Sequence, residues 1–357
     1  MLYKLDQTAY ARVTPLFQDR DVHLDIDAVL CGDCPGTVYA DDVDNPRTAC
    51  IVSGDGYYVD GATDNAAFNA ALNALFPRDE YFCLYCDFDR WGDVLDDLLV
   101  QTYAVPAGRS YLRLGELTMP DWQDHIPDGY DIRAIDRDLL SSNLEGTDDL
   151  VEGILETWRS VERFLDKGFG YCVVHHGEIV SHCNADFGVD DRSEVGVGTS
   201  WGHRRKGLAT LAAAATVSRA RDLGLIVGWH CWSNNVGSLG VARKVGFVLD
   251  RMFDVCISHW AAENVSDMTR DEFRSFAQNH ERLFQLDPPQ SGYPHIVAAT
   301  AWSLADDVEE CFRQLHQAVD IGWLCSADQL REVWPEFFFI QHLDQTDEWA
   351  ALEARLQ

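Results

Sequence analysis

Residues 194–209 read EVGVGTSWGHRRKGLA, and this stretch decides the fold. Its first part, Val195–Thr199, is a short apolar run with the composition of a β-strand. The segment that follows, Leu208–Asp222, is rich in Ala and Leu and predicts a helix, with Gly224 where a helix C-cap is expected. The sequence therefore predicts a strand, a tight basic turn and a helix in direct succession.

The turn between strand and helix has the properties of an anion site. The first N–H groups of a helix lack partners within the helix, and the helix dipole adds partial positive charge there. Gly207 allows close approach of the backbone, and Arg204, Arg205 and Lys206 add charge. These features predict a phosphate cradle. The turn is neither a Walker A sequence nor G-x-G-x-x-G, which argues against ATP and NAD.

The pattern Arg204-x-x-Gly207-x-Ala209 resembles the coenzyme A signature of the GCN5-related N-acetyltransferases (GNAT). Further along, a second strand and then Asn235, Ser238, Ala242 and Lys244-Val-Gly-Phe247 resemble the second half of that superfamily's motif. The resemblance implies an α+β fold with a mixed sheet, acetyl-CoA as the co-substrate and transfer of an acetyl group to an amine.

A closer resemblance is to a bacterial branch that includes zwittermicin A resistance acetyltransferases. It covers roughly residues 20 to 255 and is carried by W-x-S-x-E-x-F-L-x-x-G-x-G at 158–170, E-x-G-x-x-T at 194–199 and W-H-C-x-x-N at 229–234. The branch commonly has Asp at the place of His230, so either the acceptor differs here or position 230 faces the core.

The coenzyme A contacts implied by the resemblance lie on the strand, the cradle and the following helix. A generic helix-opening turn with surface arginines is the alternative. The expected contact residues are Val197, Thr199, Arg204, Arg205, Lys206, Gly207, Leu208, Ala209, Asn235, Ser238 and Lys244.

Glu194 is the leading candidate for the catalytic base, because the resemblance places the thioester against its strand. A structural ion pair with an arginine is the alternative role for Glu194, and His182, Asp186 or a base acting through water are the other candidates. Ala242 stands where the superfamily usually has a tyrosine that acts as the general acid, so a tyrosine at this position cannot protonate the thiolate here.

Three residues are expected to border the acceptor: Trp158, Glu162 and His230. The alternative is that Trp158 belongs to the core and Glu162 is a solvated charge. Cys231 beside His230 could suggest a covalent acyl-enzyme, but superfamily members usually transfer the acyl group directly.

The chain of 357 residues has a formal net charge of −31, with 42 Asp and only four Lys. Such a surface suits high-salt cytoplasm, while a GC-rich genome that favours Asp and Arg is the alternative explanation. Residues 192–251 contain nine Lys and Arg against three Asp and Glu, a local charge of about +6. This basic segment in an acidic chain predicts a polyanion site for coenzyme A, and the remaining charge disfavours nucleic acid.

Three segments are expected: an α+β domain over 1–125 that looks like a degenerate acetyltransferase half, a catalytic domain over 126–260, and a helical region over 261–357 with a tetratricopeptide-like hairpin. The first would wall the substrate cleft, and the last would cap the catalytic domain or hold a protein partner. A single helix is predicted over Asp149–Leu165. Two C-x-x-C pairs, at 31–34 and 83–86, are too far apart for a zinc ribbon, so no metal is expected.

The sequence therefore predicts an acetyl-CoA-dependent N-acetyltransferase that acts on a primary amine of a small molecule, such as an amine antibiotic, by direct attack in a ternary complex. With no apolar run of membrane-spanning length and mostly reduced thiols expected, a cytoplasmic location is anticipated. A non-catalytic acyl-CoA-binding module and a protein-directed acetyltransferase that docks through the C-terminal helices are the alternatives.

Overall fold

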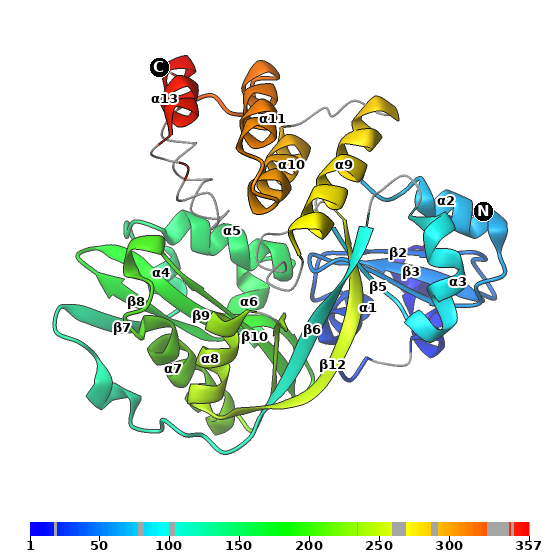
Figure 1. Ribbon diagram of the computed structural model, residues 1–357. Coiled ribbons are helices and arrows are strands. Elements are labelled where there is room, and N and C mark those ends of the chain that lie inside the picture. The colour runs from blue at the N-terminus through cyan, green and yellow to red at the C-terminus, as the bar shows by residue number, and fades with distance from the viewer. Residues whose placement is uncertain are drawn as a thin grey trace. The chain divides into compact units, whose positions relative to one another are not determined.

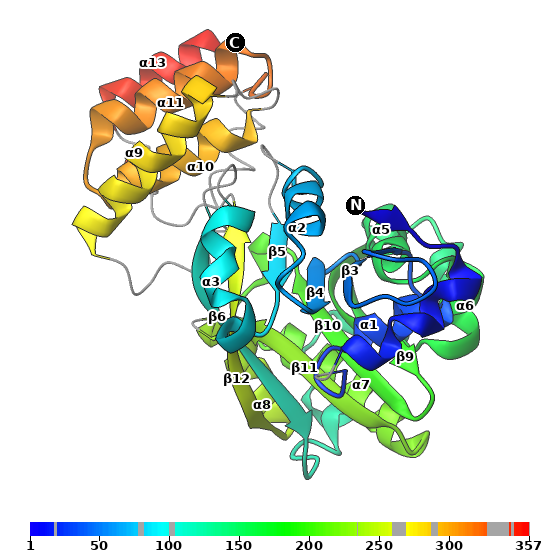
Figure 2. The ribbon, with the colours of Figure 1, turned by 90° about the vertical axis from the view of Figure 1, so that its right-hand side faces the viewer.

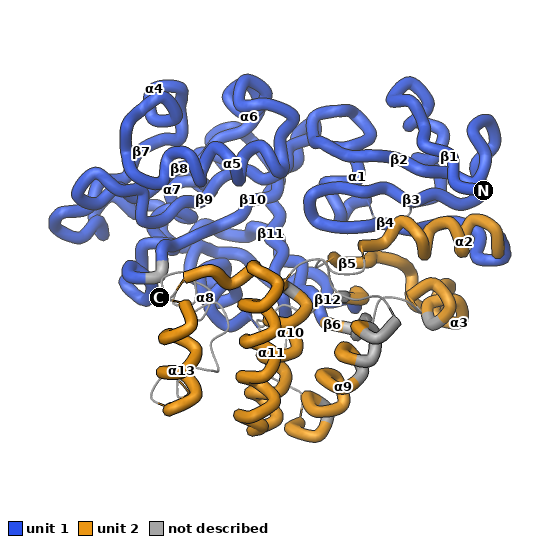
Figure 3. The backbone as a smooth tube through the Cα atoms, turned by 90° about the horizontal axis from the view of Figure 1, so that it is seen from above, with its two compact units in different colours: residues 1–65, 108–254 blue, residues 66–107, 255–357 orange. Residues whose placement is uncertain are grey.

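The computed structural model describes residues 1–17, 20–77, 82–99, 104–233, 235–258, 269–286, 292–326, 343 and 346–356. The chain forms two compact units, shown in Figure 3: unit 1 comprises 1–65 and 108–254, and unit 2 comprises 66–107 and 255–357. Each unit is thus built from two separate stretches, and both units cut across the three segments expected from the sequence.

Unit 1 contains the sheet that holds the basic turn. Six strands lie side by side in the order β6 (Ala104–Leu114, in unit 1 from residue 108), β11 (Ile226–Trp232), β10 (Arg192–Thr199), β9 (Glu178–Val189), β8 (Gly170–His175) and β7 (Tyr130–Ala134). The β10–β11 pair is parallel, and the other neighbours are antiparallel. The mixed sheet confirms the expected α+β fold class.

Helices cover both faces of this sheet, as Figure 1 shows. On one face α7 (Leu208–Asp222) packs on β8 and β9 with α8 (Val236–Val245) beside it, and on the other lie α5 (Thr147–Thr157) and α6 (Val161–Lys167), near the short α4 (Arg137–Leu140). The residues Ala212–Ala215 of α7 are buried, because small side chains let the helix lie close to the strands. The bounds of α7 agree with the sequence prediction.

The predicted helix over Asp149–Leu165 is wrong in one respect, because it breaks into α5 and α6. Trp158 ends α5 in an extended conformation, and its indole N–H donates to the Ala185 carbonyl at 2.8 Å. Ser160 then begins α6 as an N-cap that accepts a hydrogen bond from the Arg163 backbone N–H. A serine hydroxyl that caps a new helix competes with continuation of the old one, and the apolar spacing alone could not show this.

The N-terminal part of unit 1 is an antiparallel run of β1 (Tyr3–Lys4), β2 (Thr37–Ala40), β3 (Thr48–Val52) and β4 (Tyr57–Gly61). The short helices η1 (Gln7–Arg12), η2 (Thr14–Leu16) and α1 (Leu24–Cys31) accompany it. In Figure 2, α1 lies against β9 and β10 of the larger sheet. This packing brings N-terminal side chains to the centre of the unit.

Unit 2 is mostly helical in its described part. It contains α2 (Ala66–Asn73), β5 (Phe82–Tyr85), α3 (Phe88–Leu98), α9 (Arg270–Leu286), α10 (Tyr293–Leu304), α11 (Val308–Asp320) and α13 (Asp347–Arg355). β5 pairs with the end of β12 (Phe247–Ser258), and α10 packs between α9 and α11. Within the residues that the structure describes, no helix has both the length and the apolar character needed to cross a membrane.

Candidate functional site

The site begins where two parallel strands part. β10 pairs with β11 only from Arg192–Glu194 to Ile226–Gly228, whereas β10 continues beside β9 as far as Thr199. The β9–β10 register shifts between Glu194 and Val195, and a bulge of this kind bends a strand. The bend and the end of the pairing open the sheet directly after Glu194.

A cavity of about 390 Å³ lies at this opening. Its walls come from α5, β6, β9, β10, β11 and the start of α8, and all its lining residues belong to unit 1. Three of the lining residues carry a carboxyl group, namely Asp149, Glu156 and Asp186, and one, Arg109, carries a guanidinium. His182, Asn184 and His230 are further polar lining residues on the strands of the wall. The excess of acidic groups favours a positively charged ligand.

Asp186 is the most deeply buried carboxyl group of the cavity wall. Burial raises its pKa well above the ordinary value, and the nearby Glu194 and Asp55 raise it further. Asn184 donates a hydrogen bond to it at 3.1 Å. Gly196 on β10 leaves the space for this side chain, because a Cβ at position 196 would lie 2.0 Å from Asp186 Oδ2.

Glu194 and His230 form a buried pair across β10 and β11. Glu194 Oε1 and His230 Nδ1 lie 2.6 Å apart. Burial, and then Asp55, raise the pKa of Glu194 to about 8, and Arg109 offsets part of this shift. Burial, and then Arg109, lower the pKa of His230 to about 3. Both groups therefore prefer their neutral forms near neutral pH.

Five further residues gather around this pair, and the sequence reasoning missed them. His23 stacks on His230 with ring centroids 5.8 Å apart, and the Tyr111 ring lies 4.7 Å from it. Asp25 is buried and accepts a hydrogen bond from Ser53, while Asp55 pairs with Arg109 at 3.5 Å. Because these residues lie far apart in the sequence and belong to no motif, no local signal could have found them.

The basic turn has the geometry of an anion cradle. Gly207 begins α7 with φ 82°, and no side chain caps this helix end or adds an acidic group to its first turn. Arg204, Arg205 and Lys206 are exposed beside it. Uncapped N–H groups next to three cations suit a pyrophosphate, so the residues present fit coenzyme A.

The other expected coenzyme A contacts divide into two groups. Val197, Asn235 and Ser238 line the cavity. Asn235 also caps α8 by accepting from the Ser238 N–H, and the Ser238 hydroxyl accepts from Trp229 at 3.0 Å. The remainder do not line the cavity: Thr199 bonds to Ser181, Leu208 is buried in the core, Ala209 is half-buried on α7, and Lys244 is exposed on α8.

Of the three expected acceptor residues, only His230 lies in the cavity wall. Trp158 is 1% exposed and packs edge-on against Phe164 in the core, and Glu162 is exposed on the first turn of α6. Ala242 is completely buried, which leaves no hydroxyl at that position.

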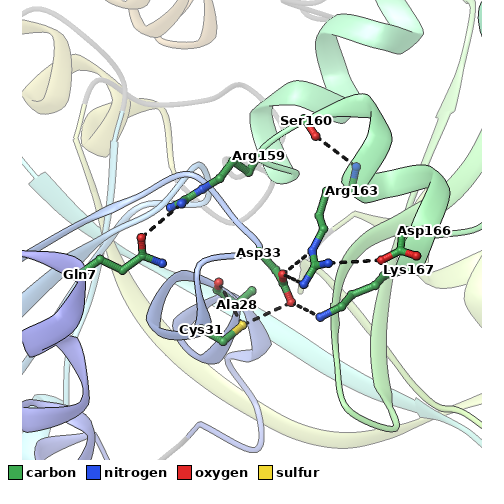
Figure 4. Close-up of polar contacts among 9 residues, drawn as sticks. All are labelled: Gln7, Ala28, Cys31, Asp33, Arg159, Ser160, Arg163, Asp166 and Lys167. Carbon is green, nitrogen blue, oxygen red and sulfur yellow. Dashed lines mark hydrogen bonds and ion pairs between the residues drawn. The ribbon is translucent and has the colours of Figure 1, made fainter.

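α6 is tied to the N-terminal part of unit 1 by a polar cluster, shown in Figure 4. The buried Asp33 forms ion pairs at 2.5 Å with Arg163 and with Lys167, and its carbonyl accepts the Arg159 N–H. Burial alone would raise the pKa of Asp33, but hydrogen bonds from Lys167 and Arg163 outweigh it, and the pKa is lowered. The cluster joins the end of α1 to the helix that follows the α5 wall of the cavity.

Comparison with known proteins agrees with this architecture. The chain is 27% identical over 252 residues to the uncharacterized N-acetyltransferase YdfB of Bacillus subtilis (strain 168), covering 69% of this chain and 95% of the relative. A crystal structure of a GCN5-related N-acetyltransferase-like protein from Streptococcus suis 89/1591 has the same fold, with a TM-score of 0.55, 24% identity and coverage of 70% of this chain and 98% of that one. The GNAT acetyltransferase family model matches residues 14–256, which end before α9. The chain therefore belongs to the GNAT acetyltransferase family and is an N-acetyltransferase.

Proposed function

We propose that the protein transfers the acetyl group of acetyl-CoA to a primary amine of a small molecule, by direct attack in a ternary complex. The observation that carries this proposal is the acidic cavity at the parting of β10 and β11, in the same unit as the uncapped, basic start of α7. A cavity of about 390 Å³ is of the size that small ligands occupy. The resemblance to zwittermicin A resistance acetyltransferases supports an amine antibiotic as the acceptor class.

The charge of the cavity favours an ammonium group over a neutral acceptor. Asp149 and Glu156 line the cavity together with one guanidinium, that of Arg109, which also pairs with Asp55, whereas the raised pKa of Asp186 favours its neutral form. A cationic amine would offset this excess, and the surrounding field would concentrate it. The acceptor must lose a proton before it attacks, so a proton acceptor is needed beside the cavity.

The residues divide this chemistry between them. Arg204–Ala209 would hold the phosphates of acetyl-CoA, which supplies the activated acyl group, and backbone groups of β10 around Val197 and Thr199 would orient the thioester. Glu194 is the proposed base, because its pKa of about 8 suits proton transfer close to neutral pH. Cys231 also lines the cavity, but burial raises its pKa, which favours direct transfer over an acyl-cysteine.

We also infer roles for the three expected segments. His23, Asp25 and Asp55 from 1–125 surround the Glu194–His230 pair, which supports a walling role for this segment beside the catalytic segment 126–260. The helices within 261–357 would cap the enzyme or provide a contact for a protein.

Calorimetric titration with acetyl-CoA, at low and at molar salt, tests the cradle. We expect Arg204→Glu to weaken binding at low salt at least about tenfold, since it reverses a charge beside the phosphates. Arg221→Glu is the matched control, because it reverses an exposed charge at the other end of α7 and should leave binding unchanged.

Thiol release from acetyl-CoA in the presence of a panel of mono- and diamines then tests turnover. Folded protein that binds no acetyl-CoA at either salt concentration would overturn the whole proposal. Binding without thiol release from any amine would leave a non-catalytic binding module in its place.

A further inference from the structure

His230 is the residue of the buried pair that reaches the cavity. His230 is among the residues that line the cavity, whereas its partner Glu194 is not. Its Nδ1 is bonded to Glu194, and its Nε2 is buried without a hydrogen-bond partner among the described residues. A buried ring nitrogen without a partner is costly, which suggests a ligand that supplies the missing hydrogen bond.

We propose that His230 and Glu194 form a proton relay, in which His230 Nε2 takes the proton of the acceptor amine while Nδ1 passes its own proton to Glu194. This inference rests on the proposed acetyl transfer to an amine. It assigns direct contact with the acceptor to His230, and it makes Glu194 the final proton acceptor instead of the group that touches the amine.

The step balances without a charged imidazole. One N–H bond of the ammonium group breaks, its electron pair stays on the amine nitrogen, and an Nε2–H bond forms. The Nδ1–H bond breaks as an O–H bond forms on Glu194 Oε1. The ring thus changes from the Nδ1–H to the Nε2–H tautomer, and Glu194 changes from carboxylate to carboxylic acid.

The surroundings of the pair suit a neutral relay. Burial and then Arg109 oppose an imidazolium at position 230 and outweigh Asp55, so the pKa of His230 is lowered to about 3. The titratable and charged groups that face the pair from the neighbouring elements are His23, Asp25, Asp55, Arg109, Tyr111 and Asp186, and Arg251 acts on His23. Of these, the carboxyl groups raise the pKa of Glu194 or are raised by it, so the relay becomes able to accept a proton as the pH rises through about 8.

The tautomer of His230 can be observed directly in the full-length protein labelled with ¹⁵N-histidine. Long-range ¹H–¹⁵N correlation spectra would be recorded from roughly pH 6 to 10, with the His230 signals assigned by their loss in His230→Gln. We expect a change from Nε2–H at low pH to Nδ1–H at high pH, with its midpoint near 8, because ionised Glu194 accepts from Nδ1. Glu194→Gln should abolish this change, and His125→Gln, an exposed histidine, should leave it intact.

A tautomer that stays constant over this range, or a change that persists in Glu194→Gln, would overturn the relay. Conversion to an imidazolium in the same range would do so as well. None of these readings depends on turnover, so the relay is judged separately from the proposed function.

A second measurement separates proton transfer from structural support. Thiol release would be compared with 1,3-diaminopropane, which is charged near pH 7, and with methoxyamine, which is neutral there. We expect His230→Gln to slow the charged amine by roughly 10²- to 10⁴-fold and to slow the neutral amine much less. Equal losses with both amines would contradict the relay, whereas no release by the wild type with either would count against the proposed function.

Discussion

At the scale of single residues, the site depends on how a carboxyl group is accommodated in a buried wall. Asp186 is surrounded by low-dielectric protein, and its Oδ2 occupies the space that a side chain at position 196 would need. Gly196 therefore contributes to the site because it has no side chain to occupy this space. The E-x-G-x-x-T pattern contains this glycine, but only the structure shows that it makes room for Asp186.

Gly196→Ala should therefore damage the site. A Cβ 2.0 Å from Asp186 Oδ2 forces a buried carboxyl group to move, and overpacking of this kind costs about 1–3 kcal/mol of stability. We expect a lower unfolding midpoint together with weaker acceptor binding, measured by thermal denaturation and by the KM for the amine.

The matched control is Gly240→Ala in α8, where an added Cβ meets no atom within 4 Å. That variant should be neutral or more stable by about 0.5–1 kcal/mol, because alanine favours a helix. If both variants behaved alike, the close contact with Asp186 would be unimportant.

At the scale of elements, α6 is positioned by charge instead of by a long apolar face. It spans only Val161–Lys167, and a helix of this length is not stable alone. The carboxylate of Asp33 receives both Arg163 and Lys167, which holds this short helix to the end of α1 (Figure 4).

Asp33→Asn should weaken this attachment by about 1–3 kcal/mol, since hydrogen bonds to charged groups contribute that much. The two cations are each about two-fifths exposed, which places the expected loss toward the lower end. Asp166→Asn is the matched control: Asp166 contacts the same Arg163 at 3.2 Å but is 68% exposed, so its loss should stay below about 0.5 kcal/mol. Urea unfolding measures both.

The pH dependence of this difference has a fixed sign. The pKa of Asp33 is lowered in the folded protein, so its contribution is present above its unfolded pKa and is lost as the pH falls through the folded value. The stability gap between wild type and Asp33→Asn should therefore shrink in acid. A gap that widened on acidification would contradict the ion-pair account.

At the scale of the whole molecule, the formal net charge of −31 sets a balance between self-repulsion and local attraction. Like charges on the surface oppose compaction, while the basic cradle of unit 1 attracts polyanions. Salt screens both effects, but they act on different observables.

Raising KCl from 0.1 M to about 2 M should increase the thermal unfolding midpoint by at least about 4 °C, because it screens the repulsion. The same change should weaken acetyl-CoA binding, since Arg204, Arg205 and Lys206 are exposed and their attraction is screened. A midpoint that falls or stays constant would favour the genome-composition explanation of the Asp-rich sequence.

The sequence by itself determined the elements and the family. The succession of apolar strand, basic glycine turn and Ala-rich helix is local, and α7 begins and ends where the pattern predicts. The acetyltransferase resemblance extends this order over roughly residues 20 to 255, and the family match at 14–256 confirms the family. Local propensity and short motifs survive folding because they depend on near neighbours in the chain.

Only the tertiary structure decided which side chains meet. Trp158 lies in the core, where its indole N–H donates to the Ala185 carbonyl. His230 lines the cavity and is bonded to Glu194, which does not line it. The tertiary structure also brought Asp25 of α1 and Asp55 of the β3–β4 turn beside that pair. The pKa values of these buried groups depend on their burial and on partners that are distant in the sequence. Both are determined only when the sheet and its helices have packed.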